Sequence, residues 1–311
     1  MKDLFVPIVG ENAVRENELM KDHTTFAVGG PADCMVFPAD AAQLGAVLSA
    51  AKAAGLETLL LGRGSNLLCA DGGVRGVVVS TERLDTLTLE GNVLTVGAGV
   101  TLRQATDFAA EAGLAGLEFA CGIPGSMGGA VYMDAGAYGG EMRDVVVDVT
   151  VLDAQGELHV IPAGEMRFGY RHSLLREEPL ICVSARIQLT PDAPEAIRGR
   201  MQELTLRRES RQPLDMASAG STFKRPEGHY TGPLIIDCGL SGYAVGGAQV
   251  SVKHAGFVVN TGAATADDVA RLIYHIEQTV QQKTGVCLET EVRFVGDWQS
   301  HPLFEKIRRA E

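Results

Sequence analysis

Glycine limits what this chain can fold into more than any other residue. The sequence holds 37 glycines among 311 residues, about 12% against an average near 7%. They follow no repeat period, and they are densest near residues 62–64, 122–129 and 136–140. Because glycine is unfavourable inside helices and weakens strands, we expect packed loops whose backbone comes close to a ligand.

The first glycine loop, residues 62–68, directly follows an apolar run at residues 58–61. Such a loop can aim successive backbone N–H groups at a phosphate, and the alternative is a tight turn that binds nothing. A second loop at residues 121–130 follows a separate β-rich segment, so we favour a dinucleotide diphosphate as the ligand of both loops over purely structural turns. The Rossmann fingerprint is absent here, because Leu67 stands where its third glycine is required.

The rest of the sequence predicts a mixed α and β chain. Helix signals are strongest at residues 40–54, capped by Asp40, and at residues 101–112, where Thr101 and Gln104 form a capping box. Two more helices are expected near residues 194–209 and 265–283. Runs rich in β-formers predict strands at residues 58–61, 77–79, 92–96, 145–152, 180–189, 255–260 and 287–295.

The chain is too long for one ordinary core, and we predict two α+β domains. The first covers residues 1–191 and contains both glycine loops. The second covers residues 192–311 and begins with a polar helix, which ends at the helix breaker Arg211-Gln212-Pro213.

Charge and hydropathy exclude several classes of partner. The net charge of −12 argues against nucleic acid or an anionic membrane, because both require a basic surface. No run approaches the roughly 18 apolar residues of a membrane span, and the N-terminal segment has no signal-peptide pattern. We expect a cytoplasmic protein that is a monomer or a weak oligomer.

Cysteine and histidine patterns predict no metal site. The six cysteines are widely spaced and form no C-x-x-C pair, so most are interpreted as reduced core thiols rather than disulfide or zinc partners. The seven histidines include no H-E-x-x-H motif. The nucleophile elbow of serine hydrolases, G-x-S-x-G, is also missing.

Several motifs along the chain resemble one flavoprotein family. The loop at residues 62–68 and the run Gly122-Ile123-Pro124-Gly125-Ser126-Met127-Gly128-Gly129-Ala130 resemble the FAD-binding domain of vanillyl-alcohol-oxidase type flavoproteins. More narrowly, the chain resembles the UDP-N-acetylenolpyruvoylglucosamine reductase family, also called UDP-N-acetylmuramate dehydrogenase or MurB. This resemblance runs from His23-Thr24-Thr25-Phe26 near the start to Glu291-Val292-Arg293-Phe294 near the end.

The resemblance implies an α+β fold, in which a vanillyl-alcohol-oxidase type FAD-binding domain precedes a smaller α+β substrate-binding domain. It implies non-covalent FAD, NADPH as reductant, and reduction of UDP-N-acetylglucosamine enolpyruvate to UDP-N-acetylmuramate. That step supplies peptidoglycan for cell wall biogenesis. The implied cofactor-binding residues are Gly62, Arg63, Gly64, Ser65, Asn66, Leu67, Gly122, Ile123, Pro124, Gly125, Ser126, Gly128 and Gly129.

Three further motifs match the active-site segments of the family, and the resemblance assigns Arg171, Ser221 and Glu291 to the chemistry. Hydride addition to an enolpyruvyl group leaves an enolate-like anion, which must be stabilised and then protonated. An arginine can hold the carboxylate with two hydrogen bonds, and a serine hydroxyl can donate the proton. Strand alternation alone places Glu289 and Glu291 on one face, so only the resemblance favours Glu291.

The same motifs suggest substrate contacts and one subclass. Lys224 and Arg225 follow the serine closely enough to meet the substrate diphosphate, although many family members have asparagine at the second position. Tyr170 is a candidate for lining the pocket, or else a packing residue. The short connection after Arg171 indicates the subclass without the tyrosine-bearing insertion. Cys121 stands where small residues are common, and non-covalent FAD is still expected.

Two alternatives from other classes remain at this point. A sugar or lactone oxidase with the same FAD domain would pass electrons to oxygen, and a flavin-binding or nucleotide-sugar-binding module would not turn over. Neither requires Arg171, Ser221 and Glu291 together. Anaerobic addition of NADPH and then enolpyruvyl substrate, with the flavin absorbance followed, separates all three.

Overall fold

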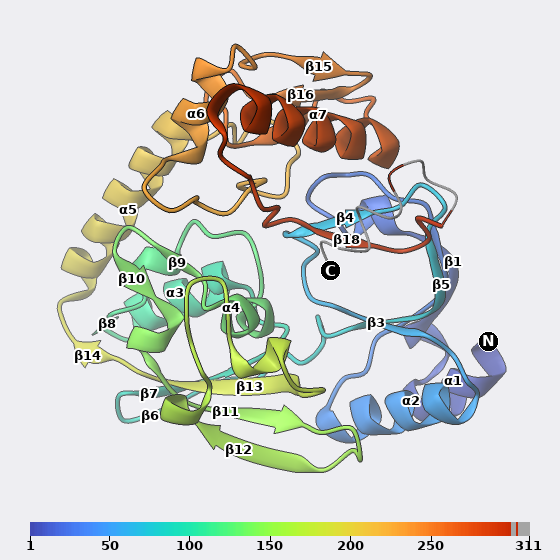
Figure 1. Cartoon of the computed structure of the whole chain (residues 1–311). Helices are drawn as coiled ribbons and strands as arrows, with labels where there is room; N and C mark the ends of the chain where they lie inside the picture. The colour runs from blue at the N-terminus through green and yellow to red at the C-terminus, as the bar shows by residue number, and fades with distance from the viewer. Residues whose placement is uncertain (300–302, 304–311) are drawn as a thin grey trace. The chain divides into compact units, whose positions relative to one another are not determined.

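A computed structural model describes residues 1–299 and 303 of the chain (Figure 1). It contains two compact units, and both are discontinuous in sequence. Among the described residues, unit 1 comprises residues 1–16, 34–63 and 77–208, and unit 2 comprises residues 17–33, 64–76, 209–299 and 303. These units interleave along the chain rather than dividing it near residue 191, so the sequence-based division into FAD-binding and substrate-binding segments stays a prediction.

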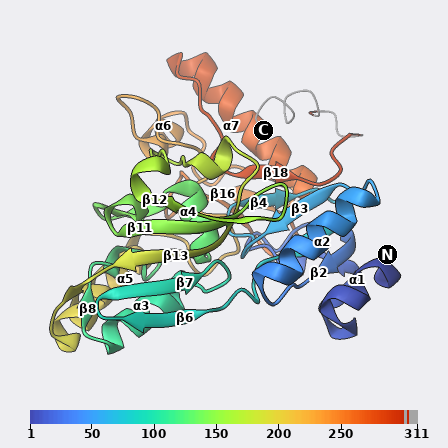
Figure 2. The same cartoon turned by 90° about the horizontal axis from the view of Figure 1, so that it is seen from below.

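Unit 1 is built on a five-stranded antiparallel sheet. Its order is β12-β11-β13-β7-β6, which Figure 2 shows side by side. The predicted strands at residues 92–96, 145–152 and 180–189 all lie in it. The bounds are β6 Leu87–Glu90, β7 Val93–Gly97, β11 Val146–Leu152, β12 Leu158–Pro162 and β13 Ile181–Gln188.

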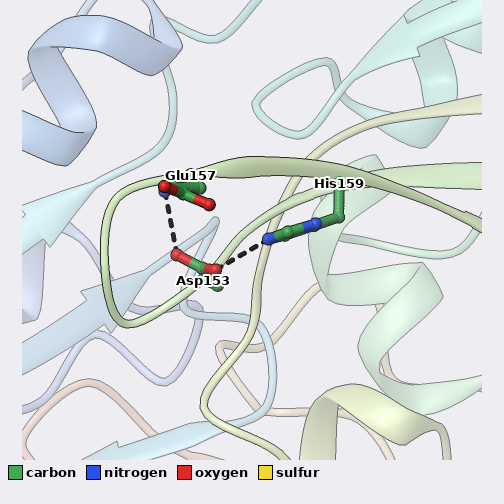
Figure 3. Close-up of side chains that lie close together, drawn as sticks. All are labelled: Asp153, Glu157 and His159. Atoms are coloured by element: carbon green, nitrogen blue, oxygen red, sulfur yellow. Dashed lines mark hydrogen bonds and ion pairs between the residues drawn. The ribbon is translucent and has the colours of Figure 1, made fainter.

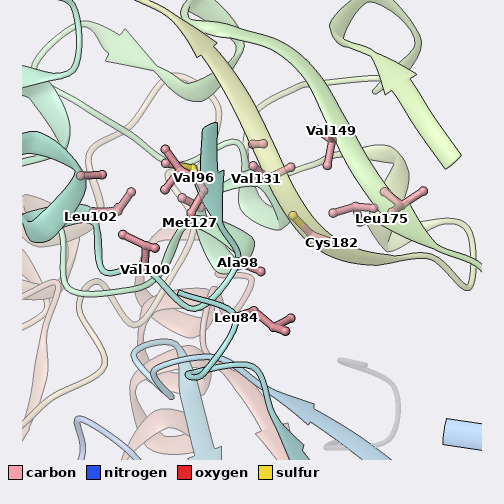
Figure 4. Close-up of a cluster of buried hydrophobic side chains, with 14 of the residues drawn as sticks. Leu84, Val96, Ala98, Val100, Leu102, Met127, Val131, Val149, Leu175 and Cys182 are labelled. Carbon is pink, nitrogen blue, oxygen red and sulfur yellow. The ribbon is translucent and has the colours of Figure 1, made fainter. Parts of the chain in front are cut away.

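The apolar side chains of this sheet and of two helices form the core of unit 1 (Figure 4). Val96 of β7, Val149 of β11 and Cys182 of β13 belong to one buried cluster with residues of the helices α3 (Leu102–Glu111) and α4 (Met127–Met133). Val96 and Val149 are completely buried. Burial of such side chains is worth about 1.5–3 kcal/mol each, so this core fixes the position of the loop that leads into α4.

Local sequence signals determine where the helices of unit 1 begin. Asp40 Oδ1 accepts from the Gln43 N–H at 2.8 Å, and α2 (Ala41–Ala53) starts at the next residue. Thr101 and Gln104 form the predicted capping box of α3. Both predicted helix starts are therefore confirmed. The remaining helices are α1 (Lys2–Val9), which lies beside α2, and α5 (Pro194–Arg211) (Figure 1).

A second sheet has the strand order β1-β2-β5-β3. The predicted strand at residues 58–61 is β3, which pairs in parallel with β5 from Thr58↔Val77 to Leu61↔Ser80. β3 runs into the first glycine loop. The bounds are β1 Val14–Leu19, β2 Pro31–Val36, β3 Thr58–Leu61 and β5 Val74–Ser80. Two further short pairs precede Glu209, namely β8 (Leu114–Ala115) with β14 (Thr190–Pro191) and β9 (Gly136–Ala137) with β10 (Gly140–Glu141).

Unit 2 packs a long helix against a small antiparallel sheet. The helix α7 (Ala266–Thr284) lies along the sheet β15-β16-β17 (Figure 1). It begins at the capping box of Thr265 and Asp268, and its Val269, Ile273 and Ile276 are buried in the core. The other bounds are α6 Thr231–Asp237, β15 Ala244–Val245, β16 Ala248–Val250 and β17 Val258–Asn260.

The last strand is shorter than the sequence predicts. The expected strand at residues 287–295 is confined to β18 (Arg293–Val295), which pairs in parallel with β4 (Leu67–Cys69). The preceding residues keep the predicted alternation, since Leu288 and Val292 are buried and Glu289 is exposed. Their backbone groups bond to other loops instead of a strand ladder.

Five of the six cysteines are buried and Cys287 is exposed. Burial raises the pKa of Cys69 and of Cys182 to about 12, so these thiols stay protonated, as expected of core residues. The Cys121 sulfur lies 3.7 Å from the Met201 carbonyl oxygen of α5. Within the described part of the chain, none of the helices has both the length and the apolar character that crossing a membrane requires.

The start of α7 is held by a carboxylate distant in sequence. Asp71 accepts hydrogen bonds from the N–H groups of Ala266 and Asp267, each at 2.9 Å. Anions are stabilising at helix N-termini, so Asp71→Ala should lower the free energy of unfolding by about 1 kcal/mol. Urea unfolding measures this, with the exposed Asp85→Ala as control. Equal midpoints in both variants would contradict a stabilising role for Asp71.

Candidate functional site

The two glycine loops meet at Gly62 and Ser126. A Cβ atom added to Gly62 would lie 2.9 Å from the Ser126 hydroxyl oxygen, so only glycine lets this hydroxyl approach so closely. Ser126 precedes α4 and is 2% exposed. Its hydroxyl has no hydrogen-bond partner among the described residues. The structure thus brings together the first residue of one loop and the centre of the other within unit 1.

This arrangement fits a polar cofactor such as FAD. A buried hydroxyl without a partner costs about 1–3 kcal/mol, and a bound diphosphate oxygen would satisfy it. Gly129 is exposed, and a Cβ atom there would approach only the Ser126 hydroxyl, at 4.0 Å. The backbone surface at Gly129 is therefore open to a ligand. Arg63 and Pro124 are exposed nearby in sequence, and Ile123 is half-buried.

Other glycines of the loops are required by the protein itself. At Gly64, where φ is +60°, a Cβ would lie 2.1 Å from the His23 carbonyl oxygen. At Gly128 it would lie 2.9 Å from the Ala98 Cβ, and at Gly122 it would lie 2.9 Å from the Arg208 side chain. For these three positions the packing of the chain is sufficient reason for glycine, whatever the loops bind.

Ser221 and Glu291 come from segments that pair with each other in unit 2. Phe223 and Thr290 form an antiparallel bridge. On either side of it, the Lys224 N–H donates to the Glu289 carbonyl at 2.8 Å, and the Glu291 N–H donates to the Thr222 carbonyl at 2.9 Å. Ser221 and Glu291 are both half-buried. The two predicted residues are therefore neighbours through their backbones.

Thr222 anchors the serine segment to the sheet of unit 2. It is completely buried, its N–H donates to the Gly256 carbonyl at 2.9 Å, and its hydroxyl oxygen accepts from the Val258 N–H at 3.0 Å. A fixed Thr222 limits where Ser221 can move. Thr222 directly follows Ser221 in the segment Gly220-Ser221-Thr222-Phe223-Lys224, but its residue type alone predicts no such anchoring role.

His254 is a residue that the sequence analysis missed. Its Nδ1 accepts from the Gly256 N–H at 3.2 Å, which places the ring proton of the neutral imidazole on Nε2. Burial lowers the pKa of His254 and favours this neutral form. The Gly256 carbonyl accepts from the Thr222 N–H, so the His254 imidazole contributes indirectly to holding the segment that carries Ser221.

Asn66 of the first glycine loop bonds to the backbone on both sides of Val292. Its side-chain amide donates to the Glu291 carbonyl at 2.9 Å, and its own carbonyl accepts from the Arg293 N–H at 2.9 Å. The parallel pairing of β4 and β18 begins at the next residue, with Leu67 opposite Arg293. Part of the predicted cofactor loop, residues 64–67, therefore lies against the segment that carries Glu291.

Arg171 occupies a tight turn of unit 1 with a left-handed backbone at φ +57°. Gly169 and His172 exchange backbone hydrogen bonds of 3.1 and 2.9 Å around the turn. The Arg171 guanidinium lies 5.1 Å from the Tyr170 ring centre, and Tyr170 is 53% exposed. The predicted catalytic arginine therefore has an ordered backbone and a half-buried side chain.

Contacts from the following residues hold this turn. Arg176 donates to the Arg171 carbonyl at 2.7 Å, and the buried Ser173 hydroxyl donates to the Tyr132 carbonyl at 2.9 Å. Glu177 pairs with both Arg167 and His172. Hydrogen bonds from these two groups lower the pKa of Glu177, so the carboxylate is charged and connects both ends of the turn.

Lys224 and Arg225 differ in their surroundings. Lys224 is half-buried and forms an ion pair with Glu289, whose side chain is 71% exposed. The Arg225 guanidinium lies 4.0 Å from the Tyr230 ring centre, and its Nε donates to the His229 carbonyl at 3.3 Å. In this structure the Lys224 ammonium group is therefore paired with the exposed Glu289 carboxylate.

Asp153, Glu157 and His159 form the closest grouping of metal-ligand side chains among the described residues (Figure 3). They lie in the hairpin between β11 and β12. Asp153 accepts from the Gln155 and Glu157 N–H groups at 2.9 and 2.8 Å, and it contacts His159 Nε2 at 2.7 Å. These hydrogen bonds lower the pKa of Asp153. The same hydrogen bonds explain why the three side chains lie close together, as parts of one polar turn.

Comparisons with known proteins find relatives along nearly the whole chain. A family model described as "FAD binding domain" matches residues 32–161, and one described as "UDP-N-acetylenolpyruvoylglucosamine reductase, C-terminal domain" matches residues 212–295. The UDP-N-acetylenolpyruvoylglucosamine reductase of Agathobacter rectalis is 47% identical, over 96% of this chain and 100% of the relative. That of Limosilactobacillus fermentum is 46% identical, over 92% of this chain and 95% of the relative.

A solved structure agrees with these sequence matches. The crystal structure of UDP-N-acetylenolpyruvylglucosamine reductase (MurB) from Thermus caldophilus superposes with a TM-score of 0.78 at 39% identity. It covers 90% of this chain and 99% of that one. The predicted α+β fold, with an FAD-binding domain followed by a smaller domain, is confirmed.

The open surface at Gly129 gives a test of the cofactor loop. Gly129→Val adds a side chain that meets no described protein atom closely, so FAD affinity should fall by roughly tenfold or more while the fold is kept. Flavin-to-protein ratio and urea unfolding measure the two effects. Gly199→Val, in another helix and equally open, is the control for valine in a helix. Unchanged flavin binding in Gly129→Val would remove Gly129 from the cofactor site.

Proposed function

Since this chain belongs to the UDP-N-acetylenolpyruvoylglucosamine reductase family, we propose that Arg171, Ser221 and Glu291 are the catalytic residues of that reaction. The enzyme is an NADPH-dependent FAD oxidoreductase that reduces UDP-N-acetylglucosamine enolpyruvate to UDP-N-acetylmuramate in peptidoglycan synthesis. The observation that supports the proposal best is the hydrogen bond from the Glu291 N–H to the Thr222 carbonyl, at 2.9 Å. It makes Ser221 and Glu291 neighbours.

Bound FAD would supply the hydride-transfer chemistry, because a flavin can take a hydride from NADPH and give it to the substrate. We assign its binding to the glycine loops, with the unpaired Ser126 hydroxyl as the polar group and Gly129 as open backbone surface. The other residues assigned to cofactor binding are Gly62, Arg63, Gly64, Ser65, Asn66, Leu67, Gly122, Ile123, Pro124, Gly125 and Gly128.

Arg171 has the role of holding the substrate carboxylate. Hydride addition makes this group electron-rich, because the negative charge of the adjacent carbon spreads into it. A guanidinium bound through two hydrogen bonds stabilises that charge more than it stabilises the ground state. The turn at residues 169–172 supports this role, since a fixed backbone reduces the reorganisation that the cation must undergo.

Ser221 has the role of the general acid, and Glu291 assists it. The Ser221 hydroxyl follows Gly220, whose φ is +75°, at a bend anchored by Thr222. It can deliver its proton to the basic carbon. Glu291, held beside it through the backbone, helps to stabilise the enolate-like species together with Arg171. The buried Thr222, which binds the Glu291 N–H through its carbonyl, holds the backbones of the two segments together.

Lys224 has the role of binding the substrate diphosphate, with Arg225 and Tyr170 as further contacts. The ion pair with Glu289 supports this role because it keeps the ammonium group ordered before substrate arrives. A diphosphate carries more negative charge than one carboxylate, and Glu289 is exposed enough to move into water. NADPH and nucleotide sugars as reactants favour a cytoplasmic location, and we propose a monomer or weak oligomer.

The roles predict different effects on the two half-reactions. Ser221→Ala should leave the reduction of FAD by NADPH nearly intact, because no proton goes to substrate carbon in that half. Reoxidation by the enolpyruvyl substrate should slow by roughly 10²- to 10⁴-fold, the usual contribution of one positioned acid. Anaerobic stopped-flow absorbance measures both halves. Reoxidation at the wild-type rate would exclude Ser221 as the proton donor.

Lys224→Ala tests the diphosphate contact. The KM for the enolpyruvyl substrate should rise by roughly 10- to 100-fold, since a hydrogen bond to a charged group is worth about 1.5–3 kcal/mol, and the rate of FAD reduction by NADPH should change little. Glu289→Gln is the matched control, because it removes the same ion pair and keeps the lysine. If Glu289→Gln raised KM equally, the ion pair rather than a substrate contact would be responsible.

A further inference from the structure

Asn66 has two different possible roles. As part of the first glycine loop it was expected to bind the cofactor. Its side-chain amide instead donates to the carbonyl of Glu291 at 2.9 Å, across 225 residues of sequence. The Asn66 carbonyl also accepts from the Arg293 N–H at 2.9 Å. Both ends of this residue are therefore directed at the segment that carries Glu291.

Glu291 depends on this contact because it lies outside a regular strand. β18 begins only at Arg293, so no strand ladder satisfies the peptide groups of Glu291. Its N–H is bound by the Thr222 carbonyl at 2.9 Å, and its carbonyl is bound by the Asn66 amide. A half-buried backbone that lost one of these bonds would have a polar group to satisfy elsewhere, and residue 291 would shift.

We propose that Asn66 is a positioning residue for Glu291, which it holds from within the cofactor loop. The proposal rests on the proposed catalytic role of Glu291. One peptide group of Glu291 is fixed by the serine segment and the other by the glycine loop, so the loop that contributes to cofactor binding also sets the place of the carboxylate. A shift of about 1 Å in such a group can reduce a rate by about 10²-fold.

Asn66→Ala removes the amide donor, and Asn92→Ala is the control for the same change at an exposed position. Because Asn66 also belongs to the proposed cofactor loop, both half-reactions are measured at saturating FAD, and we expect Asn66→Ala to slow reduction by NADPH less than it slows reoxidation. Its reoxidation by the enolpyruvyl substrate should slow by roughly 10- to 100-fold. If the reoxidation rate returned to that of wild type on saturation with FAD, Asn66 would be a cofactor-binding residue only.

A double-mutant cycle separates positioning from general damage to the fold. If Asn66 acts through Glu291, Asn66→Ala should slow reoxidation much less in a Glu291→Gln background than in the wild type. Equal slowing in both backgrounds would overturn the proposal. Hydrogen–deuterium exchange adds a readout that needs no turnover: amides of residues 288–293 should exchange faster in Asn66→Ala than in Asn92→Ala, and equal exchange would also overturn it.

The same measurements distinguish a failure of the proposed function. If the wild type and Asn92→Ala were reduced by NADPH but not reoxidised by the enolpyruvyl substrate, the reaction itself would be wrong, and a role in it for Asn66 would fall too. If the wild type turned over and Glu291→Gln were fully active, the assignment of Glu291 would fail. The exchange result would then report only a structural contact.

Discussion

The backbone hydrogen bonds of Glu291 are the constraint that joins three separate segments of unit 2. Its N–H binds the serine segment and its carbonyl binds the glycine loop, so three parts of the chain far apart in sequence meet at one residue. A strand ladder would have satisfied the same groups with a single partner. The irregular path of residues 287–292 therefore brings the backbone of Glu291 against both the segment that carries Ser221 and the first glycine loop.

Glycine serves two purposes in this chain, and only the structure separates them. Gly64 and Gly128 are required because a Cβ would meet protein atoms at 2.1 and 2.9 Å. Gly129 faces open space, next to a buried Ser126 hydroxyl without a described partner. The sequence shows the same residue type at all these positions. Glycines that are required by packing and a glycine that faces open space are thus neighbours within one loop.

Sequence reasoning succeeded where the determining contacts are local. The starts of α2 and α3 follow from side chains within three residues of Asp40 and Thr101. It failed at residues 287–292, where alternation suggested a strand, because alternation records burial and not the hydrogen-bond partner. The hydrogen bond between Asn66 and Glu291 could not be predicted from the sequence, because the residues around each of them carry no signal for a contact across 225 positions. Whether Glu289 or Glu291 is catalytic was likewise undecided without the family resemblance.

The left-handed turn at Arg171 shows how the fold maintains a conformation that an arginine alone would avoid. A non-glycine residue in that region costs about 1–3 kcal/mol and persists only where its surroundings determine it. Three sets of hydrogen bonds hold this short turn. Gly169 and His172 bond to each other through their backbones, Arg176 donates to the Arg171 carbonyl, and the buried Ser173 hydroxyl donates to the Tyr132 carbonyl. The direction in which the Arg171 side chain leaves the backbone is thus set by the turn and not by the arginine itself.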